Sequence, residues 1–187
     1  MIGPAIKSRE ISTFFSVWLG VLASLVLSIP AHAQSFQWIH QFGSLRTDIG
    51  LGAAADSTGV YVVGRADDAL PGQTFTPGGV SDAFVRKYDP SGTEQWTREF
   101  GSATIPFLSS GNDQANGVAV NGTGVYVVGQ TDGVLPGQVN AGGQSGGTDA
   151  FVRKYDTNGN EQWTRQFGSA GTDIAFAVAA DSTGIYV

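Results

Sequence analysis

Short runs of β-branched, aromatic and small apolar residues follow residue 33, and clusters rich in Gly, Asp, Asn and Ser separate them. In the run 83–88 the large side chains of Phe84, Arg86 and Tyr88 occupy every second position, the period that places neighbouring side chains on opposite faces of a strand. Residues 34–187 contain no apolar stripe at helical spacing. The pattern therefore predicts an all-β domain.

The same strand pattern recurs along the chain. The octapeptide Asp82–Asp89 is repeated letter for letter at Asp149–Asp156, and Phe-Gly-Ser occurs three times. The tryptophans Trp38, Trp96 and Trp163 stand 58 and then 67 residues apart. Self-similarity at such a period indicates a repeat architecture, in which each copy is one supersecondary unit.

Each copy predicts four short strands joined by two tight turns and one long loop. The predicted first strands are 49–55, 114–120 and 174–180, the second strands 60–63, 125–128 and 185–187, the third strand 83–88 and the fourth 95–100. The tight connections begin with Asp or Asn and end with Gly, at 56–59, 89–92, 121–124, 156–159 and 181–184. Such residues predict hairpin turns, because the first side chain can accept a hydrogen bond from the backbone two residues on.

A four-stranded antiparallel unit of this length is close in size to a propeller blade, which spans about 40–50 residues. The first strand, rich in Gly and Ala, suits a crowded central axis. Segment 36–42 has the fourth-strand sequence without the three strands before it, as expected for an outer strand that closes a ring. We therefore expect, within a domain spanning 34–187, a β-propeller built of four-stranded antiparallel blades. Its parts are outer strand 36–42, repeat one 48–100, repeat two 113–167 and partial repeat three 173–187.

The order of these motifs resembles the bacterial SBBP repeat, a β-propeller repeat of exported and surface proteins. The resemblance lies in Asp48, Asp113 or Asp173 before the small apolar strand, then Gly-Val-Tyr-Val-Val-Gly, then Asp-Ala-Phe-Val-Arg-Lys-Tyr-Asp and a glycine turn before tryptophan. It covers nearly all of residues 36–187. The resemblance implies an extracellular propeller, and it supplies no catalytic residue or cofactor.

The strands expected here amount to about two and a half blades, whereas a ring needs about four or more. Both earlier copies continue with Val-Gly at the point where the sequence stops at Val187. We therefore expect a fragment of a longer polypeptide, with unpaired blade edges that are prone to aggregate. Assembly of several short chains into one ring is the alternative.

Residues 1–33 differ in kind from the rest. Lys7 and Arg9 precede the apolar run 14–27, and small residues end the segment at Ala33. The run is shorter than the ~20 residues that span a bilayer, so the segment predicts a secretory signal peptide cleaved after Ala33. The expected location is secreted, periplasmic or cell-surface. Membrane contact would require an uncleaved signal segment or a downstream anchor.

Composition excludes or disfavours several classes of binding partner and reactive site. Ten Lys and Arg against sixteen Asp and Glu give a net charge of −6, which disfavours binding to nucleic acid. Cysteine is absent, which excludes disulfides, thiolate nucleophiles and cysteine metal sites. Charged residues make up 14%, and Gly occurs 27 times, which excludes a charge-rich disordered tail and a coiled coil.

Antiparallel strands place the tight turns at one end of each blade and the long loops at the other. The candidate ligand-binding residues on this loop face are Arg46, Asp67, Asp68, Gln73, Asp132, Gln138 and Asn140. Loops on a rigid scaffold commonly carry binding sites, and the predicted partner is an unidentified protein or carbohydrate. The alternative is that these loops are solvated spacers that tolerate insertion.

Signals for catalysis or metal binding are weak, and no catalytic, metal or cofactor residue is predicted. His40 is the only histidine after residue 33, so a Ser-His-Asp triad would have to use it. Segment 156–161 resembles a calcium loop but has Glu161 where Gly is needed at the sixth position, which favours a plain turn. The aspartates at the starts of the strands are expected to bond backbone amides and fix loops, with a metal or ligand role as the alternative. They are Asp48, Asp113 and Asp173, with Asp82 and Asp149.

Two hypotheses about function follow from the sequence. The first is an exported binding or scaffolding module that presents its long loops to a protein or glycan and has no catalysis of its own. The second is the N-terminal part of an extracytoplasmic propeller enzyme, a hydrolase or quinone-dependent dehydrogenase, with its active residues beyond Val187.

Overall fold

The structure is a computed structural model that describes residues 37–102, 111–141 and 147–187. The chain divides into two compact units, residues 1–35 and 36–187, and every described residue belongs to the second. The predicted signal peptide therefore lies outside the described residues. Within the described ranges there is no helix, and accordingly none that could cross a membrane.

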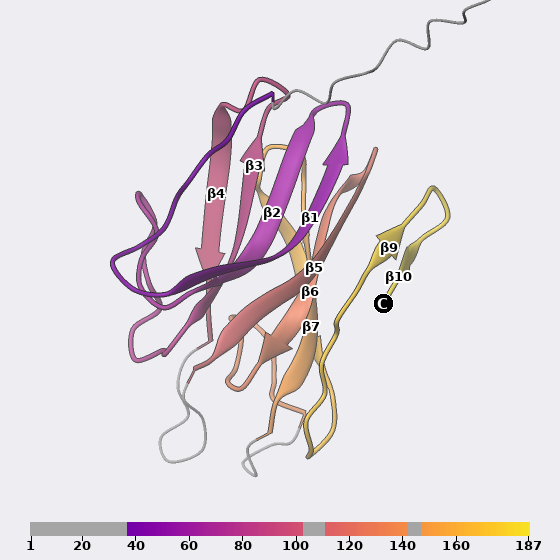
Figure 1. The fold of residues 1–187 in the computed structure, drawn as a ribbon. Helices are drawn as coiled ribbons and strands as arrows, with labels where there is room; N and C mark the ends of the chain where they lie inside the picture. The colour runs from indigo at the N-terminus through magenta and orange to yellow at the C-terminus, as the bar shows by residue number, and fades with distance from the viewer. Residues whose placement is uncertain (1–36, 103–110, 142–146) are drawn as a thin grey trace, which may run out of the picture. The chain divides into compact units, whose positions relative to one another are not determined.

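The described chain is all-β, as predicted (Figure 1). Sheet one consists of β1 (Asp48–Asp56), β2 (Gly59–Ala66), β3 (Asp82–Tyr88) and β4 (Glu94–Phe100), and sheet two of β5 (Asp113–Asn121), β6 (Gly124–Thr131), β7 (Asp149–Tyr155) and β8 (Glu161–Phe167). In both sheets all neighbouring strands are antiparallel and follow chain order. A two-stranded ladder of β9 (Ala179–Ala180) and β10 (Ile185–Tyr186) follows.

The two sheets share one register. Each first strand shifts register once, between Gly50 and Gly52 in β1 and between Ala115 and Gly117 in β5. Each pair of third and fourth strands shifts once more, just before the turn. Register follows the side-chain pattern and the turns, so nearly identical sequences give the same sheet twice.

The tight turns form as the sequence predicts. In each, the first side chain accepts a hydrogen bond from the backbone N–H two residues on, over 2.7–2.9 Å. Gly92 and Gly159 have φ of 88° and 79°, a left-handed conformation that favours glycine. A Cβ at these two positions would also lie within 2.7 Å of the ring of Trp38 or Trp96, respectively. Both the backbone and the packing therefore require glycine there.

The main core lies between the two sheets. Tyr61, Val63 and Val85 of sheet one belong to one buried cluster with Val127 and Phe151 of sheet two, and all five are fully buried. The first strands approach each other closely, since a Cβ on Gly52 would lie 3.0 Å from the carbonyl oxygen of Asn116. Small residues in β1 and β5 are thus required by sheet stacking.

The prediction of an outer strand over 36–42 is not met in the described residues 37–42, which form no strand. The segment 37–44 lies extended against β3 of sheet one, with Phe42 packed edge-on to Phe84 at 5.6 Å between ring centroids. A strand requires a backbone partner, and within the described part of the chain none pairs with it.

The predicted first strand 174–180 is also shorter than expected, because only Ala179 and Ala180 pair, with Tyr186 and Ile185. In sheet one the first strand pairs with β2, which has eight residues, whereas here the partner strand β10 has two. Residues 175 and 178 nonetheless lie where a first strand would, packed on sheet two. Among the described residues the sheets do not close into a ring, so the propeller arrangement stays a proposal.

Candidate functional site

The long loops share one end of the sheets, as predicted, and they bond to the connections between repeats. The N–H of Asp67 donates to the carbonyl of Thr47 at 3.0 Å, and the N–H of Asp132 donates to that of Asn112 at 3.1 Å. The equivalent loops of the two repeats are therefore anchored alike. These backbone hydrogen bonds join the described parts of the long loops and connections into a loop platform at this end of the sheets.

The recurring aspartates fix loops, as the sequence predicts. The carboxylates of Asp48, Asp113 and Asp173 accept hydrogen bonds from the backbone N–H of Ser44, Ser102 and Ser169, respectively, at 2.6–2.7 Å. Asp82 accepts from the N–H of Thr76 at 2.7 Å, and Asp149 accepts from that of Ala141 at 2.8 Å. Their role is to hold the loop backbone in place.

Three of these carboxylates, Asp82, Asp113 and Asp149, are fully buried, and each has one oxygen without a hydrogen-bond partner. Burial raises the pKa of Asp113 to about 6, although hydrogen bonds from Thr131 and Ser102 lower it. Burial also raises the pKa of Asp82, against hydrogen bonds from Thr76. In the described ranges, no three His, Asp or Glu side chains are arranged to hold a metal ion.

Three of the residues predicted to face a ligand instead form hydrogen bonds within the protein through their side chains. The side-chain oxygens of Gln73 and Gln138 accept hydrogen bonds from the backbone N–H of Glu99 and Gln166, at 3.2 and 3.1 Å. The carboxylate of Asp132 accepts from the backbone N–H and the side-chain amide of Asn112. These side chains hold each long loop against a strand or against the connection that precedes its repeat.

The other four predicted residues are Arg46, the consecutive Asp67 and Asp68, and Asn140. Asp67 forms an ion pair with Arg65 at 3.7 Å, and the carboxylate of Asp68 accepts from the N–H of Ala69. The side-chain amide of Asn140 is buried and has no hydrogen-bond partner. Arg46 is exposed, and of the seven it alone lines the cavity described next.

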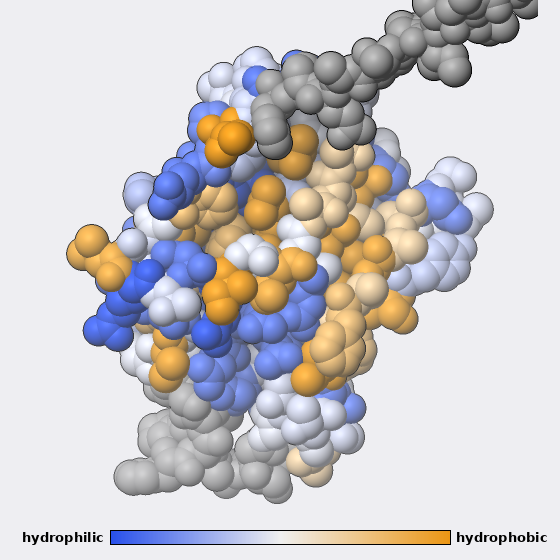
Figure 2. All heavy atoms as spheres, in the orientation of Figure 1, coloured by the Kyte–Doolittle hydropathy of each residue, from blue (hydrophilic) through white to orange (hydrophobic). Residues whose placement is uncertain are grey.

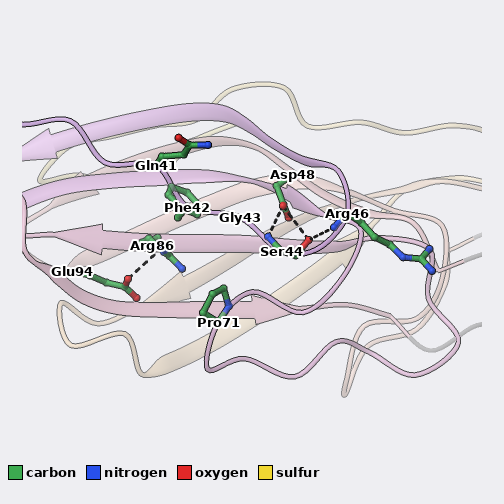
Figure 3. A pocket seen from close by; sticks show the side chains of 9 residues that line it. All are labelled: Gln41, Phe42, Gly43, Ser44, Arg46, Asp48, Pro71, Arg86 and Glu94. Carbon is green, nitrogen blue, oxygen red and sulfur yellow. Dashed lines mark hydrogen bonds and ion pairs between the residues drawn. The ribbon is translucent and has the colours of Figure 1, made fainter.

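A polar groove of about 760 Å³ opens between segment 37–44 and the outward face of sheet one (Figure 3). Its lining residues are Gln41, Phe42, Gly43, Ser44, Arg46, Asp48, Pro71, Arg86 and Glu94. The guanidinium of Arg86 lies 4.0 Å from the centroid of the Phe42 ring and forms a 3.3 Å ion pair with Glu94. Arg46 points away from that pair, toward the other end of the groove.

Arg86 differs from its counterpart in repeat two. Arg153 stacks in the same way, 3.9 Å from the centroid of Phe100, and its Nε donates to the hydroxyl of Thr164 at 2.8 Å. The Nε of Arg86 is buried and has no partner. Arg86 is only 3% exposed, so this unpaired donor lies beneath the surface of the groove.

The groove offers donors from Gln41 and Arg46 to a ligand that carries oxygen acceptors. Within its lining the hydroxyl of Ser44 donates to the carboxylate of Asp48 at 3.0 Å. The His40 ring lies outside the groove, packed at 5.3 Å on Tyr88 and at 5.5 Å on Trp38.

The carboxylate of Asp156 accepts from the backbone N–H of Asn158 and Asn160, so segment 156–161 forms the expected turn. The side-chain amide of Asn160 also donates to this carboxylate at 2.9 Å, and it lowers the pKa of Asp156 most, with the backbone hydrogen bonds adding to the effect.

Of the seven residues predicted from the sequence, Arg46 lines the groove. Arg86, Gln41 and Glu94, which also line it, come from three separate segments and were not predicted. Arg86 lies in the repeated octapeptide, where its alternation with Val85 indicates only a strand face. The signal that could have found it is the spacing of four residues from Trp38 to Phe42, which equals that from Trp96 to Phe100. Phe42 stacks on Arg86 as Phe100 stacks on Arg153.

No family model matches the chain. A curated protein, "Regulatory protein FlaEY" from Caulobacter vibrioides, is 34% identical to it over 112 residues, which cover 57% of this chain. The match covers 11% of that protein's length. The chain is therefore similar to a small part of a much longer protein.

Proposed function

We propose that this chain is part of a β-propeller of the SBBP type and acts as a binding or scaffolding module rather than as an enzyme. The observation that carries the proposal is that segment 37–44 packs on sheet one as β4 packs on sheet two. Trp38 lies on Gly92 as Trp96 lies on Gly159, and the Arg86 and Arg153 guanidinium groups stack alike.

Further contacts support the same arrangement. The indole N–H of Trp38 donates to the carbonyl of Pro90 at 3.3 Å, and that of Trp96 donates to the carbonyl of Thr157 at 3.1 Å. Segment 37–44 therefore takes the place of the fourth strand of a preceding copy. Radial repetition of such units generates a propeller.

The binding role rests on the groove and on the loop platform beside it. Arg46 and Gln41 are exposed in the groove lining, and their side-chain donors suit hydroxyl or carboxylate acceptors of a glycan or a polypeptide. Export through residues 1–33 would place the module outside the cytoplasm.

Binding of the full chain to a glycan array and to peptide libraries tests this role. We expect binding to acceptor-rich ligands that falls about tenfold in Arg46→Ala, the loss of one charge-assisted hydrogen bond. His40→Ala is the matched control, because His40 lies outside the groove lining and should leave binding unchanged. Blank arrays, or equal losses in both variants, would contradict the proposal.

A further inference from the structure

A second cavity lies at the loop end of the two sheets, where the repeats meet. Its volume is about 280 Å³, and we call it the seam cavity. Arg65 near the end of β2, Gln114 near the start of β5 and Gln130 near the end of β6 line it, with Asn112 and Asp132 in the adjoining loops. All of its lining residues are polar, and none of them lines the groove described above.

The seam cavity gathers positions at which the near-identical copies differ. At the second position of the first strand, sheet two has Gln114 where the other copies have Ile49 and Ile174. At the seventh position of the second strand, Arg65 of β2 corresponds to Gln130 of β6. The octapeptide shows that residues which build the sheets recur unchanged. Polar residues that depart from the repeat and meet in one cavity therefore point to a role other than building the sheets.

The first strand of sheet one shows what these positions carry without a cavity. Ile49 and Leu51 are 38% and 42% exposed, and Figure 2 shows apolar surface over β1 and β2 in this view. Their counterparts in β5 are Gln114 and Asn116, and the side-chain amide of Gln114 donates to the side-chain oxygen of Asn116 at 2.6 Å. Asn116 in turn donates to the backbone carbonyl of Ala175 at 3.0 Å. The Gln114 amide is thereby held in place, with its side-chain oxygen left as an acceptor.

Arg65 supplies the strongest donors of the seam cavity. It follows Tyr61 and Val63 at alternate positions of β2, and both of these pack in the core that includes sheet two. The Nε of Arg65 is buried without a hydrogen-bond partner and lies 3.7 Å from a carboxylate oxygen of Asp67, which is an ion pair but too long for a hydrogen bond. The side chain is 31% exposed, so the terminal nitrogens of its guanidinium can reach a ligand.

The charges around the seam cavity favour a neutral ligand. Among the described residues that line it, Arg65 is the one cation and Asp132 the one anion, and Asp67 pairs with Arg65 from outside the lining. A bound carboxylate or phosphate would therefore meet two carboxylates for one guanidinium, in a chain whose net charge is −6. The side chains of Gln130 and Thr148 can each donate and accept hydrogen bonds, as the hydroxyls of a sugar can.

The size of the seam cavity limits the ligand to one small unit. A volume of about 280 Å³ lies just below the range of about 300–1,000 Å³ that is usual for pockets of drug-sized ligands. Such a space suits a single ring that carries several hydroxyls.

We propose that the seam cavity binds one neutral monosaccharide unit. Its hydroxyls accept hydrogen bonds from the guanidinium of Arg65 and donate to the side-chain oxygen of Gln114, while the amide of Gln130 offers both kinds of bond. This is a second site beyond the proposed function and does not depend on it, because the groove and the seam cavity share no lining residue.

The test is a titration of the isotope-labelled full chain at pH 7 with glucose, galactose and mannose in separate series, followed by amide spectra. We expect at least one sugar to cause saturable shifts at Arg65, Gln114 and Gln130, with a dissociation constant in the millimolar range. The uronic acid of the same sugar is the control ligand. It should bind about tenfold more weakly or worse, because its carboxylate is repelled by Asp132 and Asp67.

Variants copied from the other repeats make the result specific and keep residues that the sheets already accommodate. Arg65→Gln gives β2 the residue that β6 has at the same position, and Gln114→Ile gives β5 the residue of β1. Each should weaken sugar binding about tenfold, through the loss of hydrogen bonds to the ligand. Arg165→Gln is the matched control, because Arg165 is exposed and lies outside the cavity lining, and it should leave binding unchanged.

Absence of saturable shifts with all three sugars, tighter binding of the uronic acid, or equal binding by Arg65→Gln would overturn the inference. The position of the shifts separates this site from the groove. Shifts confined to Gln41 and Ser44 would place the sugar in the groove, which supports the proposed function and refutes the seam cavity. Shifts at Gln114 and Gln130 that persist in Arg46→Ala would support the seam cavity whatever the groove binds.

Discussion

Glu99→Gln should stabilise the protein at neutral pH, and the chain itself contains the precedent. The carboxylate of Glu99 accepts from the backbone N–H of Leu70 at 2.8 Å, while its other oxygen is buried without a partner. Gln166 occupies the same place in repeat two and accepts from the N–H of Leu135 at 3.0 Å. Its side-chain N–H₂ donates to the carboxylate of Asp149 at 2.8 Å, which an ionised Glu cannot do.

The expected gain in stability of Glu99→Gln can be worked out from the pKa of Glu99. Burial, with smaller contributions from nearby aspartates led by Asp82, raises the pKa of Glu99 from 4.5 to about 7. At about 1.4 kcal/mol per pKa unit, this shift means that ionising Glu99 in the folded state costs about 3 kcal/mol of stability. Because Glu99 is half-buried, screening by water reduces the expected effect to about 1 kcal/mol. The folded-state pKa is raised, so ionisation costs stability as the pH rises from about 4.5 through 7.

Urea unfolding followed by circular dichroism from pH 5 to pH 8 measures this. We expect Glu99→Gln to exceed the wild type by about 1 kcal/mol at pH 8 and to equal it near pH 5. Gln166→Glu is the reverse control and should lose stability at pH 8 only. A pH-independent effect of Glu99→Gln, or a loss of stability at pH 8, would refute the reasoning.

The other predictions concern packing and turns. Trp96→Ala removes a half-buried ring between the sheets and should cost about 2–3 kcal/mol in urea unfolding. Gly92→Ala, at a φ of 88°, should lower stability by at least about 1 kcal/mol, whereas Gly122→Ala should be near neutral; thermal melts compare the two. The Asp181 carboxyl should titrate below 3.8 by NMR, chiefly because the Thr183 hydroxyl donates to it. Its pKa is depressed, so the contribution of this turn to stability is present at neutral pH and lost under acid.

Much of the fold could be predicted from the sequence because local chemistry decides it. The Asp-to-Gly turns fix the hairpins, and the alternation in 83–88 fixes the face of β3. The repeat then makes sheet two a copy of sheet one. Residues 37–42 of the predicted strand 36–42 and residues 174–178 of the predicted strand 174–180 form no strand, because a strand depends on a partner and not on its own sequence alone.

The site was less accessible to prediction. Gln73 and Gln138 were predicted to face a ligand because they are polar loop residues, yet their side chains bond the backbone of β4 and β8. Composition cannot tell a solvated amide from one that clamps a loop. The groove around Arg86 forms only when segment 37–44 lies on β3, a contact between residues more than forty positions apart.

The near identity of the copies has a consequence for how the gene can change. Each sheet meets its neighbour through side chains that every copy carries, such as Val63 and Val127. Unequal crossing-over within the stretch encoding the shared octapeptide would insert or delete a whole unit, and the new junction would match the old one. We therefore expect relatives of this chain to differ in length by whole multiples of the unit, while the surfaces between units stay the same.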